Sequence, residues 1–161
     1  MIRHIVAIDS SRGFAKLSPA GEVRTPWRLP GDMQYYYDHI RGQRLLMGRM
    51  TYEAIHADDG AYNYVLTHSA TMPVQNGEAV GSIDEALAKN GGRDLWVIGG
   101  VDVYAGTIAL ANELYITRVE GDFDCDRFYP EIPSFFVRSS VSAPRHENGQ
   151  AFFFEIYKRN R

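Results

Sequence analysis

Short, mostly apolar runs alternate with helix-like segments over the first two thirds of the chain. The runs lie at 5–8, 45–47, 62–67 and 95–98. Helices are expected at 30–41, 49–55, 83–90 and 101–108. Apolar runs this short are typical of strands buried on both faces. Their alternation with helices predicts a parallel sheet covered by helices on both sides.

Two of these helices are also marked by their boundary residues. The first begins at Pro30 and ends before Gly42, because proline suits a first helical turn and glycine a helix end. Its apolar residues recur with helical spacing and are expected to face a core: Met33, Tyr36, Tyr37 and Ile40. Ser82 and Glu85 form the pattern of a capping box, which predicts the start of the helix at 83–90.

The last third of the chain shows strands that follow one another without helices. They are expected at 114–119, 135–141 and 151–157. Asn148-Gly149 predicts a hairpin turn between the last two. The segment 9–25 is rich in Ser, Gly, Pro and charge and has neither strand nor helix period, so we expect a long loop there. The predicted fold class is α/β, a mostly parallel sheet with a C-terminal antiparallel hairpin.

Length and charge narrow the classes of function. A length of 161 residues predicts a single domain over 1–161. The net charge of −3 favours small molecules as partners, not nucleic acid or a membrane. Cys125 is the one cysteine and no Cys/His spacing resembles a metal site, so we expect a cytoplasmic, metal-free protein. We also expect a monomer. No apolar run is long enough for a signal peptide or a membrane span.

Two predicted strand ends carry glycines that lead into helices. In a parallel sheet, ligands bind beyond the carboxyl ends of the strands. Gly48-Arg49 and Gly99-Gly100 lie at such ends, where the first amides of a helix can bind phosphate. The Arg49 guanidinium could hold a phosphate through two hydrogen bonds, or it could simply be solvated. Two such turns on one sheet favour a dinucleotide over a single phosphate.

Asp32 is the carboxylate of greatest interest, because it lies in the first turn of a helix among apolar residues. It could complement the helix dipole, or it could pair with two adjacent N–H donors of a heterocycle. Trp27 and the tyrosines that follow could be core residues or an aromatic slot for a flat ring. Among the histidines only His68, at a strand end, is a candidate ligand contact. The others are expected to be structural or solvated: His4, His39, His56 and His146.

A series of collinear motifs covers essentially the whole chain. They are Ile5-Val6-Ala7, Pro26-Trp27-x-Leu29-Pro30-x-Asp32, Met47-Gly48-Arg49-x-Thr51-x-Glu53-x-Ile55, Tyr64-Val65-Leu66-Thr67, Val97-Ile98-Gly99-Gly100-x-x-Val103-Tyr104, Leu114-Tyr115-Ile116-Thr117 and Phe154-Glu155-x-Tyr157. In order and spacing they resemble the chromosomal type of dihydrofolate reductase.

The resemblance implies an eight-stranded α/β fold that binds NADPH along its strand ends. It also implies a reaction, in which a hydride passes to C6 of a dihydropterin while N5 is protonated. By position, Asp32 would be the active-site carboxylate that holds the amino-pyrimidine edge of the pterin. Thr117 would be its hydrogen-bonding neighbour, and Trp27 would fix an ordered water near the pterin. These three residues are the catalytic candidates.

The resemblance also assigns the residues around the two ligands. The substrate would contact Ile5, Val6, Met33, Tyr36, Ile55, Ile98 and Tyr104. The cofactor would contact Ala7, Gly48, Arg49, Met50, Thr51, Thr67, His68, Gly99, Gly100, Val101, Asp102, Val103 and Tyr104. Arg49 would be the residue that meets the 2′-phosphate.

Several positions depart from the family pattern. Ala61 stands where the family usually has an arginine that pairs with the glutamate tail of folate. Loss of one charge-assisted bond of about 1.5 to 3 kcal/mol weakens binding roughly 10- to 150-fold, unless Arg41 or Arg44 compensates. The substrate could therefore be a related dihydropterin without that tail, such as a methanopterin-like one. Val101 and Asp102 at the cofactor helix leave open a non-catalytic nucleotide-binding relative.

Overall fold

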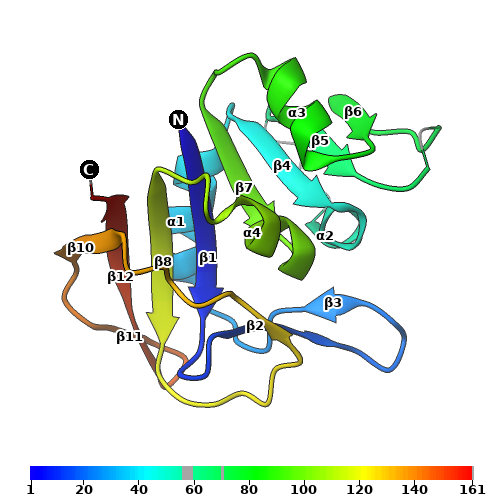
Figure 1. Cartoon of the computed structure of the whole chain (residues 1–161). Coiled ribbons are helices and arrows are strands. Elements are labelled where there is room, and N and C mark those ends of the chain that lie inside the picture. The colour runs from blue at the N-terminus through cyan, green and yellow to red at the C-terminus, as the bar shows by residue number, and fades with distance from the viewer. Residues whose placement is uncertain (56–59, 70, 161) are drawn as a thin grey trace.

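The computed structural model describes residues 1–55, 60–69 and 71–160, and its centre is one twisted sheet (Figure 1). Eight strands follow one another across it in the order β10-β12-β8-β1-β7-β4-β5-β6, and β11 pairs with β12 as a ninth. The strands are β1 (Ile2–Ile8), β4 (Arg44–Gly48), β5 (Tyr62–Leu66), β6 (Gly77–Val80), β7 (Leu95–Gly99), β8 (Glu113–Val119), β10 (Phe136–Val141), β11 (Arg145–Glu147) and β12 (Gln150–Arg159). In this spatial order, the strands β8, β1, β7, β4, β5 and β6 run parallel to one another. Strand β12 is antiparallel to its partners β8, β10 and β11. The predicted fold class is confirmed.

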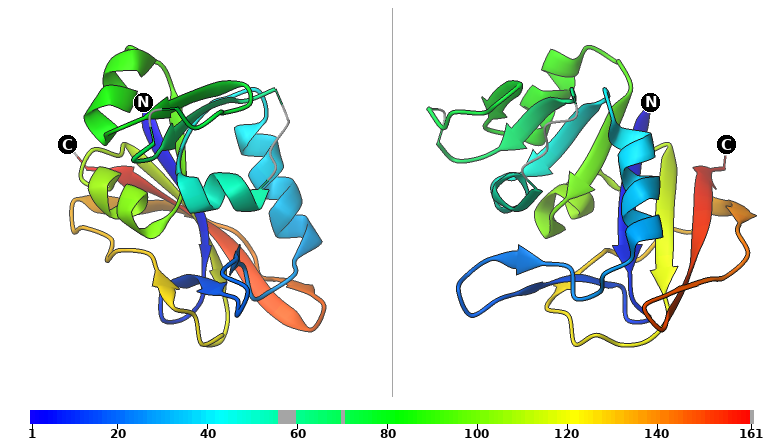
Figure 2. Two further views of the ribbon diagram at one scale, coloured as in Figure 1. Left: turned by 90° about the vertical axis from the view of Figure 1, so that its right-hand side faces the viewer. Right: turned by 180° about the vertical axis from the view of Figure 1, so that it is seen from behind.

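Helices cover both faces of the sheet (Figure 2). They are α1 (Pro30–Ile40), α2 (Arg49–Ile55), α3 (Ile83–Asn90) and α4 (Val101–Thr107). Alternate residues of each strand face opposite sides, so Ile5 packs with α1 and α2 while Val6 packs with α3 and α4. None of the described helices is both long and apolar enough to cross a membrane.

The helix and turn signals in the sequence correspond to real caps. Ser82 Oγ accepts a 3.0 Å bond from the Glu85 amide, and the Glu85 carboxylate in turn accepts a 2.7 Å bond from the Gly81 amide. Asn148 and Gly149 have positive φ angles of 50° and 73° and form the hairpin turn. That turn joins β11 to β12. Since β10 pairs farther along β12, the prediction that the turn directly joins the strand at 135–141 to the last strand is wrong.

The segment 9–25 is not the featureless loop that the sequence predicts. It contains β2 (Gly13–Leu17) and β3 (Val23–Arg24), and β2 also pairs with β9 (Arg127–Phe128). Together these form a separate three-stranded sheet beside the carboxyl end of β1 (Figure 1). The partner of β2 lies more than a hundred residues away, so no local periodicity could reveal the pairing. The short strand β6 was also missed.

The first helix departs from the predicted buried stripe at its beginning. Ile40 is fully buried and Tyr36 and Tyr37 are half-buried, but Met33 is 49 % exposed. Its first turn lies near the carboxyl end of β8, where the Asp32 side chain meets Thr117. The amino end of α1 therefore borders the sheet edge where ligands are expected, and Met33 is not a core residue.

Candidate active site

Asp32 and Thr117 come together although 85 positions separate them in the sequence. Thr117 lies on β8 and is 2 % exposed, and its Oγ1 donates a 2.7 Å hydrogen bond to Asp32 Oδ1. Burial raises the pKa of Asp32 to about 6, opposed by the Thr117 bond and assisted by the negative charge of Glu147. This carboxyl group therefore gains and loses its proton close to neutral pH, which suits a group that assists proton transfer.

Aromatic side chains form a cluster around the segment that precedes α1. Trp27 is half-buried, and its ring meets Phe123 edge-on at a centroid distance of 5.2 Å. Tyr35 stacks on Phe154 at 3.9 Å, and Leu29 is buried in the same cluster. Trp27 is thus neither a fully buried core residue nor a solvated one, and it lies five positions before Asp32 at the entrance to α1.

The predicted substrate residues divide between the two faces of the sheet. Ile5, Ile98, Tyr36 and Ile55 lie in the cluster beneath α1 and α2. Val6 and Tyr104 lie in the opposite cluster, and their contact with the substrate stays a prediction. The reason for this division is the alternation of side chains along β1.

Tyr104 nevertheless contacts β1. Its hydroxyl donates a 2.8 Å hydrogen bond to the carbonyl oxygen of Ile5. Burial raises the pKa of Tyr104 well above its ordinary value, and Tyr129 and Tyr36 add to this effect. The ring of Tyr104 thus packs in the α4 cluster while its hydroxyl reaches the backbone of β1.

A cleft of about 900 Å³ opens beyond the carboxyl ends of β4, β5 and β7. It is lined by most of the predicted cofactor residues: Gly48, Arg49, Met50, Thr51, Thr67, His68, Gly100, Val101, Asp102 and Val103. Ala7, Gly99 and Tyr104 are not part of its lining. Asp32 and Thr117 are not part of this lining either, and their contact lies at β8, which is parallel to the strands that end at the cleft.

Sequence reasoning missed one wall of this cleft. Phe14, Val23 and Arg127 line it from the small sheet of β2, β3 and β9. The end of β6 contributes Gly81 and Ser82. The β6 residues follow a strand end, as the predicted sites do, so recognising that strand would have found them. Nothing local marks the other three.

Charges of both signs lie on the cleft. Arg49 Nε is 2.9 Å from Glu53 Oε1, and both side chains are more than half exposed. Arg127 Nη1 is 3.5 Å from Asp126 Oδ1, across from the exposed Asp102 on α4. A surface pair such as Arg49–Glu53 contributes little energy, so Arg49 is available to an anion at small cost.

Gly99 shows why the turn before α4 consists of glycines. Its φ of 140° is one that residues with a side chain rarely adopt. A Cβ on Gly99 would lie only 2.9 Å from Thr51 Oγ1 of α2. The missing side chain thus lets the backbone of this turn come close to α2 at the end of the cleft.

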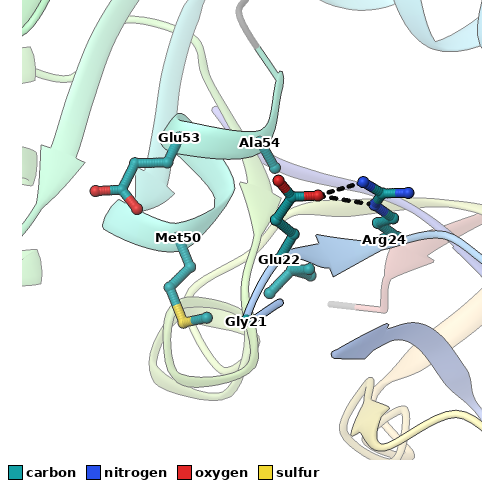
Figure 3. Close-up of a pocket in the computed structure, with 7 residues that line it drawn as sticks. Gly21, Glu22, Arg24, Met50, Glu53 and Ala54 are labelled. Carbon is teal, nitrogen blue, oxygen red and sulfur yellow. Dashed lines mark hydrogen bonds and ion pairs between the residues drawn. The ribbon is translucent and has the colours of Figure 1, made fainter. Parts of the chain in front are cut away.

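A second cavity of about 400 Å³ lies between β3 and α2 (Figure 3). It is lined by Gly21, Glu22, Val23, Arg24, Met50, Glu53 and Ala54. Glu22 and Arg24 form an ion pair on β3, and Met50 also lines the larger cleft. The hairpin of β2 and β3 therefore reaches across to α2, and the sequence analysis did not anticipate this.

Ala61 is 5 % exposed and lies in the cluster on the α1 side of the sheet. Arg44 is held on the opposite side, where its Nε donates to Asn90 Oδ1 at 2.9 Å and its guanidinium lies 4.7 Å from the ring centre of Tyr62. Arg44 therefore does not replace the missing arginine at Ala61. The neighbouring residues 56–59, which include His56, lie outside the described residues.

Comparisons with known proteins agree with this geometry. A family model described as dihydrofolate reductase matches residues 1–159. The dihydrofolate reductase of Bacillus subtilis is 29 % identical over 99 % of this chain and 95 % of its own length, and that of Neisseria gonorrhoeae is 31 % identical over 82 % and 85 %. The solved dihydrofolate reductase of Enterococcus faecalis, complexed with NADP(H), superposes with a TM-score of 0.88 at 25 % identity, covering 100 % of this chain and 97 % of that one. Because the family model covers nearly the whole chain, this chain belongs to the dihydrofolate reductase family.

Proposed function

We infer that this protein reduces dihydrofolate to tetrahydrofolate with NADPH, by hydride transfer to C6 of the pterin and protonation of N5. The observation that carries this inference is the bond between Thr117 and the half-buried Asp32, in a sheet whose parallel strands β4, β5 and β7 end at a cleft of about 900 Å³. Hydride transfer requires two flat rings held face to face, which is mainly a positioning task. A carboxyl group with a pKa of about 6 is suited to the accompanying proton transfer.

The lining of the larger cleft fits the cofactor. NADPH, when bound, supplies the hydride. Gly48 and Gly100 present backbone at the two turns, and Arg49 offers a guanidinium to the 2′-phosphate. Arg127 is a second cation on the cleft, where it pairs with Asp126, and Asp102 adds a negative charge on α4. Thr67 and His68, at the end of β5, would bind the adenosine part of the molecule.

Asp32 and Thr117 would hold the amino-pyrimidine edge of the substrate. The carboxylate would accept two charge-assisted hydrogen bonds from that edge. Trp27 would keep an ordered water between itself and the pterin. Ile5, with the side chains that share its cluster, would exclude bulk water from the ring. We further propose that the protein acts as a single-domain monomer in the cytoplasm, where its buried Cys125 stays reduced.

A related substrate without the glutamate tail is the second candidate. Ala61 offers no cation to a tail carboxylate, and Arg44 is engaged on the other face of the sheet. Arg41, the C-cap residue of α1, is exposed and is the other arginine that could serve. The substrate class is thus a dihydropterin with weak or no selection for the tail.

The decisive experiment follows the loss of NADPH absorbance with dihydrofolate and with a tail-less dihydropterin. We expect turnover of both by the wild type, and none by Asp32→Ala above background. Similar kcat/KM values for the two substrates would favour a substrate class without the tail, and a strong preference for dihydrofolate would exclude it. Absence of turnover with either substrate, although NADPH binds, would instead identify a non-catalytic nucleotide-binding relative.

A further inference from the structure

The first turn of α1 lacks a cap from its own sequence. Leu29 is the N-cap residue and makes no side-chain cap hydrogen bond, and Pro30 has no amide hydrogen to donate. The first amide that needs an acceptor is therefore that of Gly31. Asp32, the next residue, already accepts a bond from Thr117. An acceptor for Gly31 has to come from elsewhere in the fold.

Glu147 on β11 supplies that acceptor. The Gly31 amide donates to both of its carboxylate oxygens, at 2.8 Å to Oε2 and 3.1 Å to Oε1. A Cβ on residue 31 would lie 2.1 Å from Glu147 Oε1, so glycine is needed here for the carboxylate to approach. The next residue of the hairpin, Asn148, donates a 2.8 Å bond to the carbonyl oxygen of Arg28.

The hairpin of β11 and β12 thus binds the chain on both sides of Leu29 and Pro30. Figure 2 shows α1 and this hairpin at the same end of the sheet. The contact is reinforced farther along α1, where Tyr35 stacks on Phe154 of β12. The segment that carries Asp32 is therefore fixed between β8 and the hairpin, and not by its own helix alone.

We propose that Glu147 is a positioning residue for the reductase reaction, because its carboxylate fixes the first turn of α1 and thereby the place where Asp32 meets the substrate. This inference rests on the proposed function. The inference goes beyond that function because it assigns a role to the hairpin of β11 and β12, which contributes no residue to either cavity described above.

The electrostatics of the site support the same role. The amino end of a helix carries a partial positive charge that would make a first-turn carboxyl group more acidic. The carboxylate of Glu147 neutralises that end, and its negative charge helps to keep the pKa of Asp32 raised. The other groups that act on this carboxyl are Thr117 of β8, which lowers its pKa, and Tyr35 of α1, whose own pKa is raised partly by Asp32. Arg145 of β11 is the cation nearest to Gly31.

The test compares Glu147→Gln, which keeps an oxygen acceptor but loses the charge, with Glu147→Ala, which loses both. Glu131→Gln is the matched control, since Glu131 is 89 % exposed and lies outside both cavities. The pKa of Asp32 is measured in the free protein by carbon-13 NMR. The rate of hydride transfer is measured in a single turnover with NADPH and dihydrofolate.

We expect both Glu147 variants to lower the pKa of Asp32, and the control to leave it unchanged. Hydride transfer should slow roughly tenfold or more in Glu147→Ala, because a displacement of about 1 Å at a reacting group can cost 10²-fold. The Kd for NADPH should not change, since other elements line that cleft. A Glu147→Ala protein that is less heat-stable, yet keeps the wild-type pKa of Asp32 and the wild-type rate, would overturn the proposal.

Gly31→Ala tests the same contact from the other side. Its Cβ should displace the carboxylate and reproduce the slow hydride transfer of Glu147→Ala. In a Glu147→Ala background the same substitution should have a much smaller effect, since the carboxylate that it displaces is absent. Fully additive effects would also overturn the proposal. If the wild type shows no turnover, the proposed function fails, while the pKa of Asp32 still reports on Glu147.

Discussion

Asp32 is expected to make the folded protein less stable at neutral pH, and Asp32→Asn should remove this cost. Burial raises the pKa of the folded carboxyl group to about 6 from its ordinary value of 3.8. When the pKa of a group is higher in the folded state than in the unfolded state, the folded state binds the proton more tightly. The group then stabilises the fold at pH values below its unfolded pKa, and this contribution is lost as the pH rises through its folded pKa. The difference of about two units corresponds to about 3 kcal/mol at pH 7. Asparagine does not ionise, and it keeps an oxygen that can accept the bond from Thr117.

Urea denaturation of the wild type and of Asp32→Asn at pH 4 and pH 7 measures this difference. The unfolding free energy of the variant minus that of the wild type should be about 2 to 3 kcal/mol larger at pH 7 than at pH 4. Asp124→Asn is a suitable control, because Asp124 is 97 % exposed, and it should show no such change. Parallel stability curves for Asp32→Asn and the wild type would refute the argument that burial opposes ionisation at this site.

Three further predictions concern other parts of the fold. Burial lowers the pKa of His4 to about 3, so only the unfolded chain takes up a proton on this residue as the pH falls from 7 to 5. In urea denaturation, the wild type should therefore lose about 2 kcal/mol more unfolding free energy between pH 7 and pH 5 than His4→Gln does. Glu155 is 3 % exposed and pairs with Arg118, so Glu155→Ala should lower stability by about 2 kcal/mol in thermal unfolding, and Glu155→Gln by less. Gly99→Ala should cost about 1 to 3 kcal/mol and weaken NADPH binding in a fluorescence titration, because its φ is 140° and its Cβ would meet Thr51. A neutral result for any one of the three contradicts the corresponding argument.

The parallel part of the fold could be predicted because its signals are local. The strands at 45–47 and 95–98 are buried on both faces, so their apolar runs are uninterrupted. Ser82 caps its helix with an acceptor only three residues from the amide that it binds. Each of these features depends on neighbouring residues, and so the sequence displays it directly.

The small sheet and the second wall of the cleft could not be predicted in this way. The pairing of β2 with β9 joins segments more than a hundred residues apart, and β9 consists of Arg127 and Phe128 alone. A strand of two residues has no periodicity to detect. The stability of these elements comes from contacts between them, which become visible only when both are placed beside the carboxyl end of β1.

Asp32 shows how far local sequence can go in describing a site. Its position in a first helical turn among apolar residues marked it as unusual, but the direction of its pKa shift is set by burial in the assembled fold, and two remote residues modify it with opposite effects. Thr117 donates to the carboxylate and favours ionisation, whereas Glu147 brings a second negative charge and opposes it. Both arrive on strands from the last third of the chain. Burial outweighs the Thr117 bond, and therefore the chemistry of this carboxyl group is a property of the assembled sheet and not of the helix that carries it.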